Sequence, residues 1–212
     1  MTTGRTSLSL TFHPATPSRW SDLAELFGER GACGGCWCMF WRLSRKEFDA
    51  GKGSKNKRAL KRIVESGREP GILAYDGKEP IGWCAIAPRA DYTALERSRI
   101  LKPVDDHPVW SVSCLFIKKS YRRQGVSSML LRAVVAFAKS HGAGIVEGYP
   151  VEPSMEKMPD PFLWHGVPSA FLDAGFKEVA RRSPSRPIMR FEIPARQNAG
   201  HHRGVAKTQT FP

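Results

Sequence analysis

The chain has 212 residues, of which 41% are hydrophobic and 10% aromatic, and this size and composition suit one globular domain with a full core. It contains no apolar run of the about 18 residues that a membrane span needs, and residues 1–20 lack the apolar centre of a secretory signal. Its five cysteines, an odd number, do not make a disulfide framework. We therefore expect a cytoplasmic protein without a membrane partner.

The formal net charge of +13 is unevenly distributed. Residues 42–68 contain ten Lys or Arg and three Asp or Glu, and four more arginines lie within residues 181–190 with no acidic residue among them. A nucleic-acid surface is one interpretation of this pattern. Because no aromatic residue interrupts the charges from 49 to 68, we favour a solvated basic face that attracts a polyanionic cofactor, and we expect no nucleic-acid partner.

The first third of the chain predicts a strand over residues 8–12, an amphipathic helix over 20–27 and a basic helix over 53–66. Between the two helices lies a loop with the spacing Cys33-x-x-Cys36-x-Cys38, which is typical of zinc or redox sites. No Cys or His pair follows nearby to complete four ligands. We therefore predict no metal, with the thiols packed as small apolar groups.

The rest of the chain alternates strands and helices. A polar connection over residues 88–108, with one helical piece over 92–100, has a length that indicates function or disorder rather than core. Residues 1–194 are expected to form one domain, and residues 195–212 a disordered polar tail. The other predicted elements are strands over 71–75, 80–87, 109–118 and 145–149, helices over 127–140 and 169–174, a loop over 150–168, and a terminal hairpin over 176–182 and 187–193.

Residues 121–128, Tyr-Arg-Arg-Gln-Gly-Val-Ser-Ser, form a turn between the strand over 109–118 and the helix over 127–140. Gly125 can adopt a positive φ, and Ser127 and Ser128 are of the type that caps a helix start. Such a turn directs free backbone N–H groups and the positive end of the helix dipole at one point. The sequence therefore predicts an anion site, with phosphate as its usual occupant.

The spacing Arg122-x-x-Gly125-x-Ser127 resembles the Arg/Gln-x-x-Gly-x-Gly/Ala signature of the GNAT superfamily of acetyl-CoA-dependent acyltransferases. A second stretch, residues 170–179 with the pair Gly175-Phe176, is similar to the family's last helix and the strand after it. The resemblance covers roughly residues 70–193. It implies an α/β (α+β) fold with a mixed, mostly antiparallel central sheet, one splayed parallel strand pair, and helices on both faces.

The resemblance also implies acetyl-CoA (coenzyme A) as cofactor, with its pyrophosphate at the turn and its pantetheine arm along a strand edge. A backbone N–H near Ile117 would then stabilise the oxyanion that forms during transfer. The residues expected to bind the cofactor are Phe116, Ile117, Lys118, Arg122, Arg123, Gln124, Gly125, Val126, Ser127, Ser128 and Phe171.

In this family, the segment between the first two helices often lines the acceptor pocket. The chain has more aromatic surface than one core needs, although core packing is the other interpretation of these residues. We predict a small-molecule amine with an apolar part as acceptor; a homodimer is left open. The residues expected to bind it are Trp37, Phe40, Trp41, Trp83, Trp110 and Trp164.

Transfer to an amine needs a general base, and the strand over 110–114 has no acidic residue. Glu147 on the neighbouring strand is the predicted base; its other role would be to pair with an arginine. Glu152 and His165 are weaker candidates. Many family members place a Tyr where this chain has Phe171, so the predicted proton donors are Ser169, Tyr149 or water.

We therefore predict an N-acetyltransferase that works by direct attack of the amine on acetyl-CoA in a ternary complex. The alternative is a non-catalytic acyl-CoA-binding or nucleic-acid-binding regulator on the same fold. That alternative draws on Phe171 in place of Tyr, on the acid-free strand and on the basic stretch over 42–68.

Overall fold

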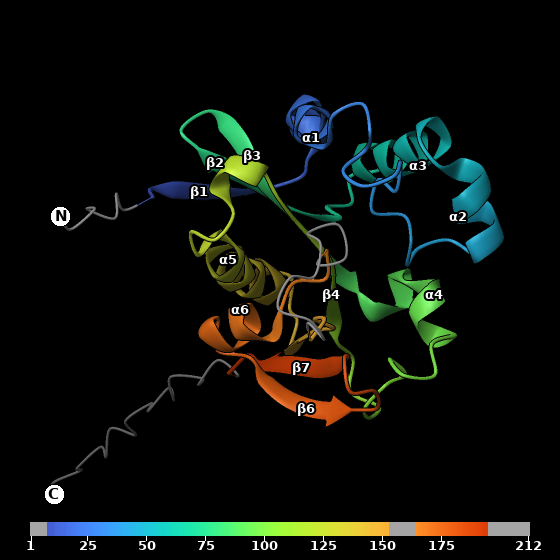
Figure 1. Ribbon diagram of the computed structural model, residues 1–212, viewed down its shortest axis with the longest axis vertical. Helices are drawn as coiled ribbons and strands as arrows, with labels where there is room; N and C mark the ends of the chain where they lie inside the picture. The colour runs from blue at the N-terminus through green and yellow to red at the C-terminus, as the bar shows by residue number, and fades with distance from the viewer. Residues whose placement is uncertain (1–7, 153–163, 195–212) are drawn as a thin grey trace, which may run out of the picture.

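The computed structural model describes residues 8–152 and 164–194, which form a seven-stranded sheet with helices on both faces (Figure 1). The strand order is β1-β2-β3-β4-β5-β7-β6, and every neighbouring pair is antiparallel except β4 with β5, which is parallel. This arrangement confirms the predicted fold class. The strands are β1 (Leu10–Pro14), β2 (Gly71–Asp76), β3 (Glu79–Pro88), β4 (Trp110–Ile117), β5 (Ile145–Gly148), β6 (Lys177–Arg181) and β7 (Pro187–Glu192).

The helices divide between the two faces of this sheet. Five of them, all except α2, overlap segments for which the sequence predicts a helix, and α1 matches its predicted bounds. The helices are α1 (Trp20–Phe27), α2 (Arg45–Gly51), α3 (Ser54–Glu65), α4 (Thr93–Glu96), α5 (Val126–Ser140) and α6 (Pro168–Asp173), with 3-10 turns η1 (Pro17–Arg19), η2 (Arg89–Asp91) and η3 (Lys119–Tyr121).

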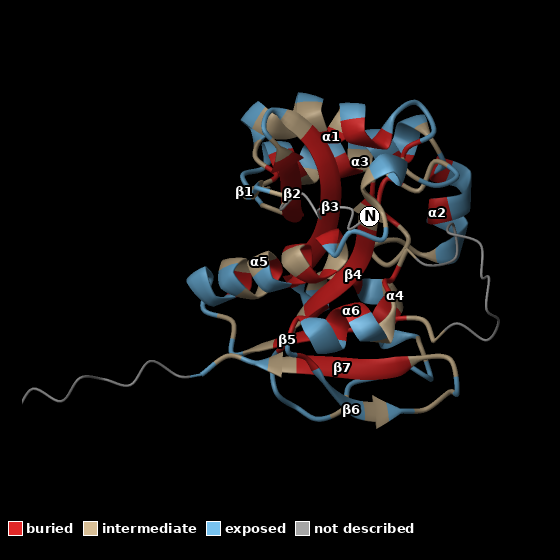
Figure 2. Ribbon diagram, turned by 60° about the vertical axis from the view of Figure 1, so that its left-hand side comes forward, coloured by how far each residue is buried: buried red, intermediate tan, exposed pale blue. Residues whose placement is uncertain are grey.

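One core lies between the sheet and helices α5 and α6. Helix α5 buries Leu130, Leu131 and Val134 completely, which is the spacing that places side chains on one helical face. They pack against apolar residues of β2, β3 and β4 and against Phe171 of α6. In Figure 2 the central strands are almost entirely buried, because helices cover them from both sides.

A second core covers the opposite face. It joins Leu23 and Phe27 of α1, Trp37 of the cysteine-rich loop, Leu60 of α3 and Trp83 of β3. Helix α2, which the sequence analysis missed, begins at a capping box. There the Ser44 side chain accepts from the N–H of Glu47, whose carboxylate accepts from the N–H of Ser44.

The prediction that residues 88–108 lie outside the core is wrong. Tyr92, Leu95 and Leu101 from this connection are buried and pack against Tyr149 and Ile188 in a third cluster. The apolar residues are spaced too irregularly along the connection to show a helical or strand period, so the sequence pattern did not reveal them. The first strand is also displaced, since β1 begins at Leu10 and ends at Pro14.

The tail over 195–212 and most of the predicted loop over 150–168 lie outside the described residues. None of the helices within the described residues has the length and apolar character to cross a membrane.

Candidate functional site

The turn after β4 ends in a left-handed glycine. Gly125 has φ +80° and is the N-cap of α5, and no side chain caps the helix. The prediction that Ser127 or Ser128 caps the helix is therefore wrong, because both lie within its first turn. The first N–H groups of a helix have no partner within it, so an N-cap without a side chain leaves them available to a ligand.

Hydrogen bonds hold this turn in place. Arg122 Nε donates to the carbonyl of Ile117 at 3.0 Å, and the Gln124 amide donates to the carbonyl of Ser120 at 2.7 Å. The Tyr121 hydroxyl donates to Asp76 at 3.0 Å, which fixes the turn to the β2–β3 hairpin. The hydrogen bond to Asp76 is the main reason that the pKa of Tyr121 is raised to about 12. The turn is thus positioned before any ligand arrives.

Strands β4 and β5 pair over only three residues and then separate. Their register joins Trp110 to Val146, Ser111 to Glu147 and Val112 to Gly148. Beyond that point the segment 164–166 lies between the strands, since Leu115 N–H donates to the carbonyl of Trp164 at 2.7 Å and Val151 N–H donates to the carbonyl of Gly166 at 3.0 Å. The splayed parallel pair that the fold class predicts is therefore present, with a short piece of chain in its opening.

The strand edge that faces this opening differs from the predicted one. Lys118 N–H donates to the carbonyl of Ile81 on β3 at 2.8 Å, away from the gap. Backbone groups along an antiparallel strand alternate between its two neighbours, so Phe116 also faces β3, while Leu115 and Ile117 face the gap. This geometry favours Leu115 and Ile117 over Phe116 and Lys118 as the backbone groups open to a ligand, and the cofactor contacts themselves stay predictions. Leu115 could have been identified from the sequence as a residue that faces the gap, because it lies two residues before Ile117 on the same strand.

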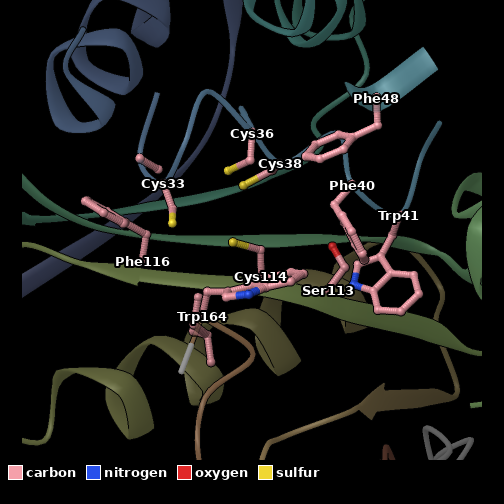
Figure 3. A pocket seen from close by; sticks show the side chains of 12 residues that line it. Cys33, Cys36, Cys38, Phe40, Trp41, Phe48, Ser113, Cys114, Phe116 and Trp164 are labelled. Atoms are coloured by element: carbon pink, nitrogen blue, oxygen red, sulfur yellow. The ribbon is translucent and has the colours of Figure 1, made fainter. Parts of the chain in front are cut away.

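A cavity of about 210 Å³ opens beside this strand edge, on the face of the sheet that carries α1, α2 and α3 (Figure 3). In Figure 3 the sulfur atoms of four cysteines lie at its centre, with Phe40, Trp41 and Phe48 on one side of them and Phe116 on the other. The lining residues are Ala32, Cys33, Cys36, Cys38, Phe40, Trp41, Phe48, Ser113, Cys114, Leu115, Phe116 and Trp164.

Three of the six aromatic residues predicted to bind the acceptor line this cavity: Phe40, Trp41 and Trp164. Trp37 and Trp83 do not line it and are fully buried in the second core, where Trp83 Nε1 donates to Cys38 Sγ at 3.1 Å. Trp110 belongs to the first core and packs against Phe137 of α5 and against His141, the residue that follows this helix. The prediction that Trp110 binds the acceptor amine is therefore contradicted, because its side chain packs on the face of the sheet opposite to the cavity.

The loop that supplies the thiols has an unusual backbone. Four non-glycine residues in the described chain have positive φ; three of them, Ala32, Trp37 and Cys38, lie in this loop, and the fourth is Arg123 in the turn. Such conformations cost energy and concentrate at functional sites. These positive-φ residues thus lie in two segments, the cysteine-rich loop and the turn before α5, that the sequence predicts to contribute to the site.

Two of the thiols that line the cavity, Cys36 of this loop and Cys114 of β4, have raised pKa values. Burial is the main cause that raises the pKa of Cys36 to about 11, and a hydrogen bond with Cys38, together with burial, raises the pKa of Cys114 well above its usual range. Within the described residues, His, Cys, Asp and Glu side chains form no group of three or more that could hold a metal ion. The absence of zinc stays a prediction, which elemental analysis of the purified protein would check.

Glu147 is completely buried and belongs to a network of polar side chains. One oxygen accepts from the Tyr149 hydroxyl at 2.7 Å and from Arg89 at 3.3 Å, and the other accepts from Arg190 Nε at 2.7 Å. The Tyr149 hydroxyl also lies 2.8 Å from Ser111 Oγ. Burial and the charge of Glu147 raise the pKa of Tyr149 well above its usual range. Neither Glu147 nor Tyr149 lines the cavity, so this geometry favours the pairing role of Glu147 over that of a base.

The other residues considered for catalysis lie in or near the segment 164–166, which occupies the gap between β4 and β5. His165 is buried against Trp164, with ring centroids 3.6 Å apart, and its Nδ1 has no partner within the described residues. Burial, with a smaller effect of Arg186, lowers the pKa of His165 well below 6.5. Phe171 is fully buried in the first core, and Ser169 is exposed on α6. The catalytic roles predicted for Glu147, Ser169 and Tyr149 stay predictions.

Comparison with known proteins identifies the class to which this fold and site belong. The sequence model of the acetyltransferase (GNAT) family matches residues 37–154, which is more than half of the chain. The chain therefore belongs to the GNAT family of acetyltransferases. No curated protein matches the sequence.

Solved structures share the fold at low sequence identity. A GNAT-family acetyltransferase from Listeria monocytogenes matches with a TM-score of 0.53 at 8% identity, over 87% of this chain and 95% of its own. YncA from Salmonella typhimurium, with its cofactor acetyl-CoA, matches with a TM-score of 0.52 at 10% identity, over 91% of this chain and 97% of its own. A GNAT-family acetyltransferase from Streptococcus agalactiae matches with a TM-score of 0.52 at 12% identity, over 88% and 96%.

Proposed function

We propose that this protein transfers an acetyl group from acetyl-CoA to the amine of a small acceptor, within a single domain over residues 1–194. The observation that carries the proposal is the position of the cavity. It opens against Leu115 and Phe116, at the gap between β4 and β5 and on the same strand that leads into the Gly125 turn. A cofactor bound along this strand would present its thioester to the cavity.

The residues of the chain fit such a cofactor at two points. The uncapped start of α5 offers N–H groups to a pyrophosphate, and the gap-facing edge at Leu115 and Ile117 offers backbone groups to a pantetheine arm. Acetyl-CoA supplies the activated acetyl group. The Leu115 N–H is well placed to stabilise negative charge on the thioester oxygen, once the Trp164 carbonyl has released it.

The acceptor would occupy the cavity between the aromatic wall and the thiols. Trp164 and Phe40 meet edge to face, with centroids 5.4 Å apart, and they enclose the acceptor side while the strand edge orients the acetyl side. Holding both reactants in one enclosed place converts a bimolecular encounter into a nearly unimolecular step. The mechanism we propose is direct attack in a ternary complex.

The test is turnover of acetyl-CoA with a panel of small amines, with products identified by mass spectrometry and cofactor binding measured by titration calorimetry. Acetylated product with any amine supports the proposal. Tight binding of acetyl-CoA without transfer to any amine would favour the non-catalytic alternative. Failure to bind acetyl-CoA would overturn the proposal altogether.

A further inference from the structure

The cavity beside Leu115 has no charged side chain among the described residues that line it. Its polar side-chain groups are thiols, the hydroxyl of Ser113 and the indole N–H groups of Trp41 and Trp164. The raised pKa values of Cys36 and Cys114 keep these two thiols neutral at pH 7. An ammonium group that entered this cavity would lose its hydration without gaining a counter-ion, and that exchange is strongly unfavourable.

The segment that contributes Phe48 to the cavity is rich in basic residues, and this charge acts in the same direction. Helices α2 and α3 lie within residues 42–68, which carry ten Lys or Arg and three Asp or Glu, and Phe48 of α2 lines the cavity. A second hollow shares Phe40, Trp41 and Phe48 with the cavity and includes Arg45 and Arg97. An excess of positive charge at an entrance repels cations and attracts neutral or anionic molecules.

The aromatic wall contains a hydrogen-bond donor that the fold leaves unused. Trp41 Nε1 is buried and has no partner within the described residues. In Figure 3 this nitrogen lies on the side of the indole ring that faces Phe40 and Ser113. A buried donor without an acceptor costs free energy, and a ligand with an acceptor atom would recover it.

We propose that the acceptor is a neutral aromatic amine, with its nitrogen conjugated to the ring and with a hydrogen-bond acceptor elsewhere on the molecule. This inference rests on the proposed function. Conjugation withdraws the nitrogen lone pair into the ring, so the amine is unprotonated at pH 7. It needs no carboxylate to deprotonate it before attack, which accounts for a cavity without an acidic residue in its described lining.

The size and shape of the cavity agree with this class. A dry apolar cavity of about 150 Å³ accommodates benzene, so the 210 Å³ here suits one ring with a substituent. The rings of Phe40, Trp41 and Trp164 offer faces and edges for a flat molecule. The acceptor atom of the ligand would meet Trp41 Nε1 once a rotation of the indole ring exposes this buried nitrogen to the cavity.

A matched pair of amines tests this inference. 4-Methoxyaniline and 4-methoxybenzylamine share the ring and the methoxy oxygen, but the extra methylene isolates the nitrogen and makes it an ammonium at pH 7. An alkyl ammonium with a pKa near 10 is neutral only to about one part in 10³ at pH 7, so we expect kcat/KM for 4-methoxyaniline to be higher by roughly 10²–10³. From pH 7 to 9, kcat/KM for the benzylamine should rise by about tenfold per unit, while that for the aniline stays flat.

The Trp41→Phe variant tests the unused donor. In the unchanged protein, 4-methoxyaniline should have a lower KM than 4-methylaniline, which lacks the acceptor oxygen, and Trp41→Phe should abolish that difference. Trp20→Phe is the control, because Trp20 packs against Trp37 in the second core and does not line the cavity.

Equal or inverted kcat/KM values for the two methoxy amines at pH 7 would overturn the inference while the acetyltransferase function stands. So would acetylation of neither amine by a protein that acetylates other amines. A protein that does not bind acetyl-CoA in calorimetry would instead remove the proposed function on which the inference rests.

Discussion

The backbone N–H of Leu115 and the carbonyl of Trp164 lie 2.7 Å apart, at the place where β4 and β5 separate. One N–H cannot serve both this carbonyl and the thioester of a bound cofactor. We therefore predict that acetyl-CoA displaces the Trp164 carbonyl and changes the environment of the indole ring. Tryptophan emission should change on saturation with acetyl-CoA, and the change should be lost in Trp164→Phe. Emission that is unaltered while calorimetry registers binding would show that the segment stays in the gap.

The turn before α5 gives a second prediction. Gly125→Val should weaken acetyl-CoA binding by about tenfold or more, because the left-handed conformation costs other residues roughly 1–2 kcal/mol and the altered backbone redirects the N–H groups. The added Cβ meets no atom within 4 Å, so the fold should survive.

The other end of α5 offers a matched control for calorimetry. Gly142 also has φ +80° and open space around its Cβ. Gly142→Val should therefore lose similar stability but keep its affinity for acetyl-CoA. Equal affinities for both variants would mean that the turn does not hold the cofactor.

The network around Glu147 gives a third prediction, which separates a structural role from a catalytic one. Glu147→Gln leaves Arg89 and Arg190 without a buried counter-charge and should destabilise the fold by about 3–5 kcal/mol in denaturant unfolding. Asp105→Asn alters a more exposed partner of Arg190, so it should lower the free energy of unfolding by less than Glu147→Gln does. If Glu147 is instead the general base, the folded variant should lose roughly 10²–10⁴ in transfer rate and change its pH profile.

The fourth prediction concerns pH. The pKa of His165 is lowered by burial, so the folded protein disfavours the protonated ring while the unfolded chain takes up a proton near pH 6.5. This contribution to stability is complete above pH 6.5 and is lost as the pH falls below it, by up to about 1.4 kcal/mol per unit. His165→Gln should flatten the fall of the free energy of unfolding between pH 6.5 and 5, and an unchanged fall in this variant would contradict the prediction.

Local patterns predicted much of the fold, because periodicity and turn chemistry act over a few residues. The helix over Trp20–Phe27 and the turn at Gly125 are both where the sequence places them. The capping box of Ser44 and Glu47 was visible in the sequence as well. It marks the start of α2, a helix of seven residues that shows only a short apolar pattern.

Long-range contacts could not be predicted in the same way. Glu147 meets Arg89, which is 58 residues earlier in the chain, and Arg190, which is 43 residues later, and nothing in their local sequence joins them. Trp110 looks equally suited to either face of β4, since a strand alternates its side chains and the register decides which face each one occupies. The sequence indicated a pocket mainly through the aromatic residues of the segment between α1 and α2, of which Phe40 and Trp41 line the cavity.

The order of strands constrains when this protein can assemble during synthesis. β7, the last strand in the sequence, lies inside the sheet between β5 and β6, and it carries the Arg190 that pairs with Glu147. Until the ribosome has released β7, the strand β5 has an open edge and its buried carboxylate lacks one of its two arginines. Because contacts between distant parts of a chain form slowly, the β4–β5 gap should be completed late in co-translational folding, after the β1–β3 meander.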